Sequence, residues 1–301
     1  MKYIVTGGAG FIGSNLVDAL LKNGHKVIVI DNLYTGKKEN LNKKAKFVKA
    51  DIRDFKKIKL LFKGVDGVFH LAAIPRVIIS VEDPLLTSEV NILGTLNVFK
   101  AAIDNKVPRV VFASSSSIYG AQDKLPLQED MKPNPLSPYG LQKLVGEQFA
   151  QLFSASSKTQ IISLRYFNVY GPRIDFKSDY SLVIGKFLRL KAEGKPFTIF
   201  GDGEQTRGFC FVQDVIDANM RAMTSQKLSG GKVINIGQRD SHSINYLADL
   251  LDGKKKYFPP RAADPLHTQA DTTKAKELLN WEPSVSFKDG VTLTKNWFLS
   301  L

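Results

Sequence analysis

The sequence predicts an α/β fold in which a doubly wound parallel sheet carries helices on both faces. Three observations predict it: short apolar runs alternate with amphipathic stretches, a glycine-rich turn joins the first such pair, and polar residues follow several of the apolar runs. In an open parallel sheet, ligands bind where the carboxyl ends of the strands meet. We therefore expect the polar residues at these strand ends to form the functional site.

The glycine-rich turn covers Thr6–Gly13 and lies between the apolar run Tyr3–Val5 and a segment with apolar residues at helical spacing. Glycines let backbone N–H groups approach a phosphate, and the N-terminus of the following helix adds partial positive charge. This is typical of a Rossmann-type dinucleotide-binding turn. The residues predicted to lie at the cofactor are Gly7, Gly10, Phe11, Ile12 and Gly13.

The next apolar run, Val27–Ile30, ends in Asp31, about 20 residues past the turn. A carboxylate there can accept hydrogen bonds from the adenosine ribose and repels a 2′-phosphate, which predicts NAD rather than NADP. The alternative is an ordinary βαβ turn with a solvated Asp.

A further short strand, Lys46–Ala50, ends at Asp51. Its carboxylate can meet the adenine amino group or cap the following helix, and the sequence leaves both alternatives open.

Composition places the chain among ordinary globular proteins: 301 residues, 43% hydrophobic and 24% charged. No apolar run approaches the roughly 18 residues of a membrane span, and a strand starting at Lys2 leaves no room for a signal peptide. We therefore expect a cytoplasmic protein without a membrane partner.

The single cysteine, Cys210, excludes an internal disulfide, and four scattered histidines predict no metal site. The net charge of +13 is compatible with nucleic acid, but the dispersed lysines favour a solvated surface and no nucleic-acid partner.

Gly67–Ala73 predicts a buried strand that runs into a small-residue turn beside the cofactor, with His70 as a packed core histidine. A helical stretch follows over about residues 84–105. The next strand, Val110–Ala113, leads into four serines, Ser114–Ser117. Hydroxyls at this strand end are positioned for chemistry, although serines by themselves are ordinary turn residues.

A second pattern raises the significance of the serines. Tyr139 and Lys143 open a helix that runs towards Ser156, and residues four apart share a helix face. A cation beside a phenol favours the phenolate, so we expect Lys143 to lower the pKa of Tyr139 from about 10. Such a tyrosine can remove a hydroxyl proton while hydride leaves the same carbon. A Tyr-x-x-x-Lys pattern alone occurs by chance in many helices, but beside the serines and the glycine-rich turn it indicates a catalytic set.

Together these motifs resemble the extended short-chain dehydrogenase/reductase family, and specifically its nucleotide-sugar 4-epimerases of the UDP-glucose and UDP-N-acetylglucosamine type. The resemblance extends from Thr6 to about Pro283. Besides the motifs above it includes Leu164–Arg173, Gly201–Arg207, Asn235–Gly237, Pro259–Arg261 with Asp264, and Leu278–Trp281.

The resemblance implies roles for individual residues. Ser115 and Tyr139 would contact the sugar hydroxyl that is oxidised, and Lys143 would hold the nicotinamide ribose. Asn168, Arg207 and Arg261 would contact the nucleotide diphosphate, and Thr268 would leave room beside the sugar for an N-acetyl group. The other contacts expected are Asn32, Asp51, Ile52, Leu71, Ala72, Ala73, Asn91 and Tyr166 to the cofactor, and Ser116, Ser117 and Asp264 to the substrate.

The serines also discriminate between reactions. Related dehydratases carry Thr-Asp-Glu where Ser115–Ser117 stand, and serines cannot replace that acid/base pair. The resemblance therefore implies a UDP-hexose 4-epimerase that uses tightly bound NAD and a 4-keto intermediate to interconvert UDP-glucose and UDP-galactose, with their N-acetyl forms. The alternatives are another NAD-dependent nucleotide-sugar oxidoreductase or dehydratase, or a non-catalytic regulator that binds NAD or RNA.

The expected organisation is an NAD-binding Rossmann domain over residues 1–173, joined by returning segments at about 211–237, and a smaller α/β substrate lobe mainly over 174–301. Apolar helices around 85–103 and 141–153 fit a homodimer interface, which is a family expectation, or simple core packing.

The chain departs from its relatives at Arg76, where Ser is usual, at Ile78–Ile79, where Pro-Arg is usual, and at Gly208, where Asp is usual. These departures leave the local substrate contacts open.

Overall fold

The computed structural model describes residues 1–178, 181–260 and 266–301. Within these ranges its main sheet has seven strands, all parallel, in the order β11-β6-β5-β4-β1-β2-β3. The strands are β1 (Lys2–Thr6), β2 (Lys26–Asp31), β3 (Lys46–Lys49), β4 (Gly67–His70), β5 (Arg109–Ser115), β6 (Gln160–Tyr166) and β11 (Val233–Ile236). The order reverses between β1 and β4, which is the switch point of a doubly wound sheet. The predicted fold class is confirmed.

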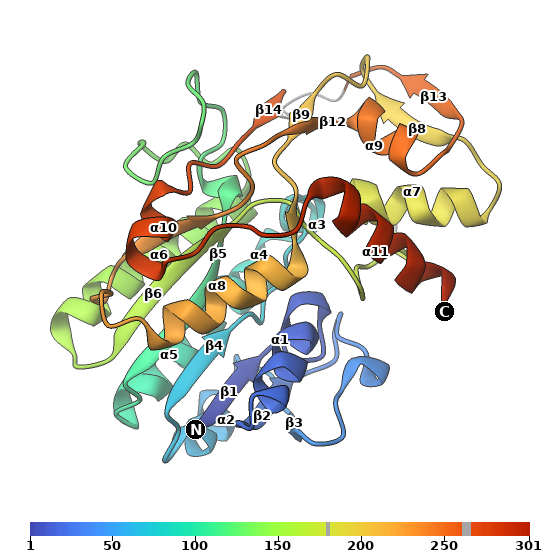
Figure 1. The fold of residues 1–301 in the computed structure, drawn as a ribbon. Coiled ribbons are helices and arrows are strands. Elements are labelled where there is room, and N and C mark those ends of the chain that lie inside the picture. Colours follow the sequence, from blue (N-terminus) through green and yellow to red (C-terminus); the bar gives the residue numbers. More distant parts are fainter. Residues whose placement is uncertain (179–180, 261–265) are drawn as a thin grey trace.

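The sheet is apolar on both faces because helices cover both (Figure 1). Alternate residues of β1 enter different cores: Tyr3 and Val5 pack on one side, and Ile4 on the other. Helices α1 (Phe11–Lys22), α8 (Val212–Thr224) and α10 (Thr273–Leu279) cover the first side. Helices α2 (Phe55–Lys59), α5 (Thr95–Asp104) and α6 (Pro138–Ser156) cover the second.

The helical stretch expected over residues 84–105 consists of three parts. It starts as α4 (Pro84–Ser88), whose first turn is capped by the Asp83 side chain. A π-helical turn (Glu89–Gly94) follows and then α5. A Cβ on Gly94 would lie 2.6 Å from the Ile52 side chain, so this glycine lets the turn approach the end of β3. A short helix, α3 (Val77–Glu82), precedes α4 and was not expected. Short 3₁₀ turns occur at Lys38–Asn40, Leu60–Phe62 and Ser116–Ile118.

Outside the main sheet there are three small sheets among the described residues. They pair β7 (Val169–Tyr170) with β10 (Cys210–Phe211), β8 (Phe197–Phe200) with β13 (Lys255–Phe258), and β9 (Thr206–Arg207) with both β12 (His242–Ser243) and β14 (His267–Thr268). The two sheets that contain β8 and β9 lie above the carboxyl edge of the main sheet (Figure 1). Helices α7 (Val183–Ala192), α9 (Ile244–Leu250) and α11 (Phe287–Leu299) share a separate, aromatic-rich core with the sheets that contain β7 and β8. The strand β11 lies in the main sheet, while the domain boundary at 173/174 stays a prediction.

The described helices include none that combines the length and the apolar character needed to cross a membrane. In the same ranges no three His, Cys, Asp or Glu side chains are grouped so that they could hold a metal ion.

Candidate active site

The carboxyl ends of β1, β2, β4, β5 and β6 open into a cavity of about 1600 Å³ that extends to the small sheets. Most of the predicted site residues line it. On the predicted cofactor side these are Gly7, Gly10, Phe11, Ile12, Gly13, Asp31, Asn32, Asp51, Ile52, Leu71, Ala72, Ala73, Lys143 and Tyr166. On the predicted substrate side they are Ser115, Ser116, Ser117, Tyr139, Asn168, Arg207 and Thr268. Two predicted residues, Arg261 and Asp264, lie outside the described residues.

The glycine-rich turn packs so tightly that side chains are excluded. Gly7 has φ +73°, and a Cβ there would lie 2.7 Å from the backbone nitrogen of Ala72. A Cβ on Gly13 would lie 2.2 Å from the Gly7 carbonyl oxygen. At Gly10 and Gly13 the start of α1 therefore presents backbone to the cavity, a cradle that fits the pyrophosphate of a dinucleotide, while Phe11 and Ile12 add apolar side chains to the lining.

At the end of β2, Asp31 is fixed by the backbone around it. Its carboxylate accepts hydrogen bonds from Ala9 N at 3.0 Å and from Leu33 N at 2.8 Å. Burial raises the pKa of Asp31, although these two backbone hydrogen bonds act in the opposite direction. The carboxylate reaches the cavity wall beside the glycine turn, which is the place expected for a group that binds the adenosine ribose.

Asp51 does not cap the helix that follows it. That role falls to Asp54, which accepts a hydrogen bond from Lys57 N. Asp51 instead accepts hydrogen bonds from Asn32 Nδ2 and from Arg53. The hydrogen bond from Arg53 is the main reason why the pKa of Asp51 falls to about 2. The capping alternative is therefore wrong, and the adenine contact of Asp51 stays a prediction.

Two buried residues, His70 and Asn91, lie behind the cavity wall. The ring of His70 is hydrogen-bonded to Thr6 Oγ1 at 2.7 Å and Thr95 Oγ1 at 3.0 Å, which confirms it as a packed core histidine. Burial lowers its pKa to about 3, and the charge of Lys143 adds to this effect. Asn91, predicted to contact the cofactor, hydrogen-bonds the backbone of Ile74 and the side chain of Gln142 instead. It is not part of the cavity lining and positions Ile74 in this structure, while its contact with the cofactor stays a prediction.

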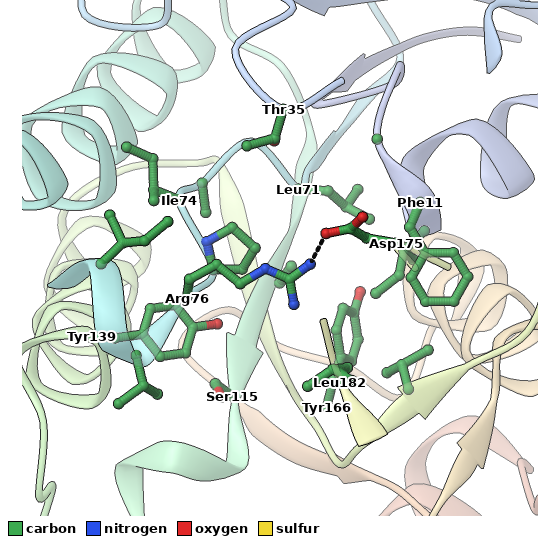
Figure 2. A pocket seen from close by; sticks show the side chains of 18 of the residues that line it. Phe11, Thr35, Leu71, Ile74, Arg76, Ser115, Tyr139, Tyr166, Asp175 and Leu182 are labelled. Carbon is green, nitrogen blue, oxygen red and sulfur yellow. Dashed lines mark hydrogen bonds and ion pairs between the residues drawn. The ribbon is translucent and has the colours of Figure 1, made fainter. Parts of the chain in front are cut away.

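The three predicted catalytic residues come together on one wall of the cavity. Ser115 ends β5, and Tyr139 stands beside it on the first turn of α6 (Figure 2). The helix can approach because Gly140 has no side chain: a Cβ there would lie 2.5 Å from the Ser117 carbonyl oxygen. Lys143 lies one turn further along, with Nζ 5.9 Å from the centre of the Tyr139 ring.

The electrostatics of this set differ from the sequence-based prediction. Burial raises the pKa of Tyr139, whereas a hydrogen bond from Ser115 and the positive charge of Arg76 lower it by less. The ammonium of Lys143 donates to the Ala113 carbonyl oxygen at 2.7 Å, and burial lowers its pKa to about 7. The expectation that Lys143 lowers the pKa of Tyr139 is therefore wrong for the chain by itself: the net shift is upward because Tyr139 is withdrawn from water, and the charge that opposes this shift is that of Arg76.

A buried ion pair supports the wall from behind. Glu147, one turn after Lys143 on α6, binds Arg165 of β6 at 2.8 Å and accepts a hydrogen bond from Ser114 Oγ at 2.6 Å. Both charged side chains are almost fully buried. Separating the two side chains would leave a buried charge without a counter-ion, which is costly. The pair, together with the hydrogen bond from Ser114, therefore holds α6 against β5 and β6.

Three predicted substrate residues from β9, β14 and the segment after β6, here called the Arg207 wall, lie next to one another in the lining. Asn168 has φ +35°, and its Nδ2 donates to the Gly208 carbonyl oxygen at 3.3 Å and to Thr268 Oγ1 at 3.2 Å. Arg207 pairs with Thr268 in the small sheet, and its Nη1 donates to the carbonyl oxygens of Thr206 and Leu266. Backbone carbonyls thus orient Arg207 even though Gly208 replaces the usual Asp.

The sequence reasoning missed part of the charge in the cavity. The described lining contains eight Lys or Arg residues and three Asp residues. The residues not predicted as site residues include Lys37, Arg53, Arg76, Arg173, Asp175, Lys177 and Lys186. Lys37 stands in a basic loop that was noticed only as a loop, and Arg76 was noticed only as a departure. For Asp175 and Lys186 no sequence signal was available, because their position depends on how the second layer folds over the sheet.

A dinucleotide-binding turn, an acid at the end of β2 and a Ser-Tyr-Lys set on one wall define a cofactor-dependent α/β enzyme fold. Comparison with known proteins makes this specific: residues 3–237 match the family described as the NAD dependent epimerase/dehydratase family. The chain belongs to this family, and NAD is its cofactor.

Relatives named for different activities cover nearly the whole chain. A putative UDP-glucose 4-epimerase of Methanocaldococcus jannaschii is 41% identical over 98% of this chain and 97% of that protein. A UDP-glucuronate 4-epimerase of Thermodesulfobacterium geofontis is 38% identical over 98% and 95%. A UDP-N-acetyl-alpha-D-glucosaminuronate decarboxylase of Bacillus cytotoxicus is 34% identical over 99% and 97%.

Solved structures agree with this assignment. A UDP-glucose 4-epimerase of Thermotoga maritima, with UDP-glucose, superposes with a TM-score of 0.95 at 40% identity, covering 100% of this chain and 99% of that one. A UDP-glucose 4-epimerase of Thermus thermophilus, in complex with NAD, gives a TM-score of 0.90 at 35% identity, with 99% of both chains covered.

The burial of Lys143 predicts a pH dependence of stability. Between the folded pKa of about 7 and the ordinary value of 10.5, the unfolded chain binds a proton at Lys143 that the folded protein has lost. The contribution of this residue to the free energy of unfolding therefore rises with pH across that window. We expect the free energy of unfolding of the wild type, minus that of Lys143→Met, to increase from pH 7 to pH 10 and to level off below pH 7. Urea denaturation over this range measures it, and a difference independent of pH would show that the folded protein keeps the proton.

Proposed function

We propose that this protein is a UDP-hexose 4-epimerase that interconverts UDP-glucose and UDP-galactose, together with their N-acetyl forms. The observation that carries the proposal is the wall formed by Ser115, Tyr139 and Lys143, in which Ser116 and Ser117 follow at the strand end instead of an acid/base pair. This wall provides groups for moving a hydroxyl proton and none for removing water from the sugar.

In this mechanism the chain supplies the proton transfer. Ser115 Oγ and the Tyr139 oxygen bind the hydroxyl at C4 of the sugar, and Tyr139, as the phenolate, accepts its proton as that carbon loses hydride. Because burial raises the pKa of Tyr139 in the chain alone, this step depends on the positive charge that the oxidised nicotinamide would add beside the phenol. Lys143, anchored on the Ala113 carbonyl, would hold the nicotinamide ribose. When bound, NAD supplies a reversible hydride acceptor. Return of hydride to the other face of the 4-keto sugar and of the proton from Tyr139 gives the epimer, with no net change in the cofactor.

The return of hydride to the opposite face requires the sugar to rotate, so the nucleotide must carry most of the affinity. We assign this part to the Arg207 wall, where Asn168 and Arg207 line the cavity. A guanidinium suits pyrophosphate oxygens because its N–H groups form a planar fork. Arg261 and Asp264 join the same subsite by family resemblance alone.

Two rivals differ in their consequences. A net oxidoreductase, dehydratase or decarboxylase begins with the same oxidation and ends in a different product, so product analysis separates it from an epimerase. A non-catalytic NAD-binding or RNA-binding regulator has no chemical need for Ser115, Tyr139 and Lys143 on one wall. Its binding to RNA would weaken steeply with salt. We therefore favour an epimerase, and after it another nucleotide-sugar enzyme, over a non-catalytic regulator. A cytoplasmic location is proposed for either.

The first test is NMR of the purified protein with UDP-galactose and then UDP-N-acetylgalactosamine, without added NAD. Conversion to the gluco epimers supports an epimerase that carries its own cofactor. We expect Tyr139→Phe to lower turnover by about 10³-fold, because the proton acceptor is lost, and to leave NAD bound. A lasting 4-keto or deoxy product, or an active Tyr139→Phe variant, would contradict the proposal. If conversion requires added NAD, only the tight retention of the cofactor is wrong.

Thr268 provides a test of sugar size. It lines the cavity next to Arg207 and Asn168, where a larger side chain would fill space beside the sugar. We expect Thr268→Tyr to lower kcat/KM for UDP-N-acetylgalactosamine by more than about tenfold and that for UDP-galactose by less than about threefold. Thr268→Ser, which keeps the space, is the control. Equal losses for both sugars in Thr268→Tyr would remove Thr268 from this role.

We also propose a homodimer. Leu85 of α4, Leu93 of the π-helical turn, and Leu141 and Leu152 of α6 are at least half exposed and leave an apolar surface on these helices. We expect sedimentation velocity to give about twice the chain mass of 33.4 kDa. The double variant Leu93→Glu/Leu141→Glu should sediment as a monomer, because it places charges in the contact. A monomeric wild type at micromolar concentration would refute the dimer.

A further inference from the structure

An ion pair spans the cavity beside the proposed catalytic set. Arg76, in the loop after β4, donates from Nη2 to Asp175 Oδ2 at 2.9 Å. Asp175 belongs to the segment that follows β7, so the pair connects the main sheet with the second layer. Figure 2 shows the Arg76 side chain extending from the loop between Tyr139 and Asp175, with Ser115 below it. Both members of the pair line the cavity.

The two partners are held very differently. Asp175 accepts hydrogen bonds from Lys177 N, Ser178 N and Ser178 Oγ. Although burial raises the pKa of Asp175, these hydrogen bonds and the charge of Arg76 hold it below its usual value, so the carboxylate is ionised at neutral pH. Arg76 is attached through Nη2 only. Among the described residues, its Nε and Nη1 have no protein acceptor. A guanidinium has five N–H donors, and most of those of Arg76 remain unused in the cavity.

The position of Arg76 relates it to a defined part of the sugar. Its positive charge acts on Tyr139, the residue proposed to bind the hydroxyl at C4. On a hexose ring, the substituents at C3 and C5 flank C4. When the C4 hydroxyl is bound by Tyr139 and Ser115, a group attached to one of these neighbours enters the part of the cavity that Arg76 shares with Tyr139. The unused N–H groups of a guanidinium match a carboxylate in charge and in planar geometry.

We propose that Arg76 is a specificity-determining residue that extends the substrate range to nucleotide sugars with a carboxylate on a substituent next to C4. The inference rests on the proposed 4-epimerase function and deepens it. The carboxylate can be attached at C5, as in UDP-glucuronate, or through O3, as in UDP-N-acetylmuramate. Both present the same chemistry to Arg76.

Asp175 explains how neutral hexoses stay acceptable. A guanidinium without a counter-ion in a half-buried site is costly, and a neutral sugar could not replace the lost water. With Asp175 fixed by its own turn, Arg76 keeps an anionic partner when the sugar is neutral. When the sugar carries a carboxylate, Arg76 binds it through Nε and Nη1, or exchanges Asp175 for it. Asp175 therefore competes with the substrate carboxylate for the same cation.

Equilibrium binding to the NAD-loaded protein tests this without requiring turnover. Calorimetry measures Kd for UDP-glucose, UDP-glucuronate and UDP-N-acetylmuramate in the wild type, Arg76→Gln, Asp175→Asn and Lys177→Gln. We expect Arg76→Gln to weaken binding of at least one carboxylated sugar by about 10- to 100-fold, the range for a hydrogen bond between charged groups, and UDP-glucose by less than about threefold. Asp175→Asn removes the competing anion and should strengthen binding of the same carboxylated sugar. Lys177→Gln removes a nearby exposed cavity cation and should affect all three sugars alike.

The opposite signs of the two main variants make the test decisive. If Arg76 and Asp175 only join the two layers, both substitutions weaken all three nucleotide sugars to a similar degree, and the proposal falls. If Arg76 only acts on Tyr139, Arg76→Gln leaves every Kd unchanged and shifts the pH profile of turnover instead, which also overturns it. Turnover is then measured separately with UDP-galactose. Absence of epimerisation there would refute the proposed function, while carboxylate-selective binding that depends on Arg76 would still stand as a property of the cavity.

Discussion

The site depends on how closely the chain approaches itself at the carboxyl edge of the sheet. Gly7 lies against Ala72, and Gly140 lies against the backbone of Ser117, at distances that leave no space for a Cβ. The first contact brings the N-terminus of α1 next to the end of β4. The second brings the start of α6 next to the end of β5. Without both approaches, the dinucleotide cradle and the Ser-Tyr-Lys wall would not face one cavity.

Much of this was predictable because it is local. The glycine turn, the acid at the end of β2 and the serines at the end of β5 are adjacent in sequence to strands that periodicity identifies. What could not be predicted depends on distant parts of the chain. The π-helical turn directs Asn91 to Ile74 and Gln142, partners that its local sequence does not indicate. Asp175 follows β7, and its place in the cavity lining depends on how the second layer packs over the sheet.

Burial changes the chemistry that spacing predicts. A lysine four residues after a tyrosine implies an acidified phenol, but both groups are withdrawn from water in this fold, and burial is the largest influence on the pKa of each. The nearby Glu147 is already paired with Arg165 and hydrogen-bonded to Ser114. Glu147 is thus engaged behind the wall, and among the described lining residues Lys and Arg outnumber Asp. This excess of positive charge suits anionic nucleotides and their phosphates.

The π-helical turn gives the sugar side of the cavity its stiffness. Asn91 both donates to and accepts from the backbone of Ile74, and its amide also reaches Gln142 on α6. The peptide groups just before Arg76 are thus clamped to two helices by a single side chain. A displacement of Ile74 must either break these hydrogen bonds or carry the helices with it. The backbone just before Arg76 is consequently held in place by these hydrogen bonds. Adjustment to different sugars is then left to the Arg76 side chain.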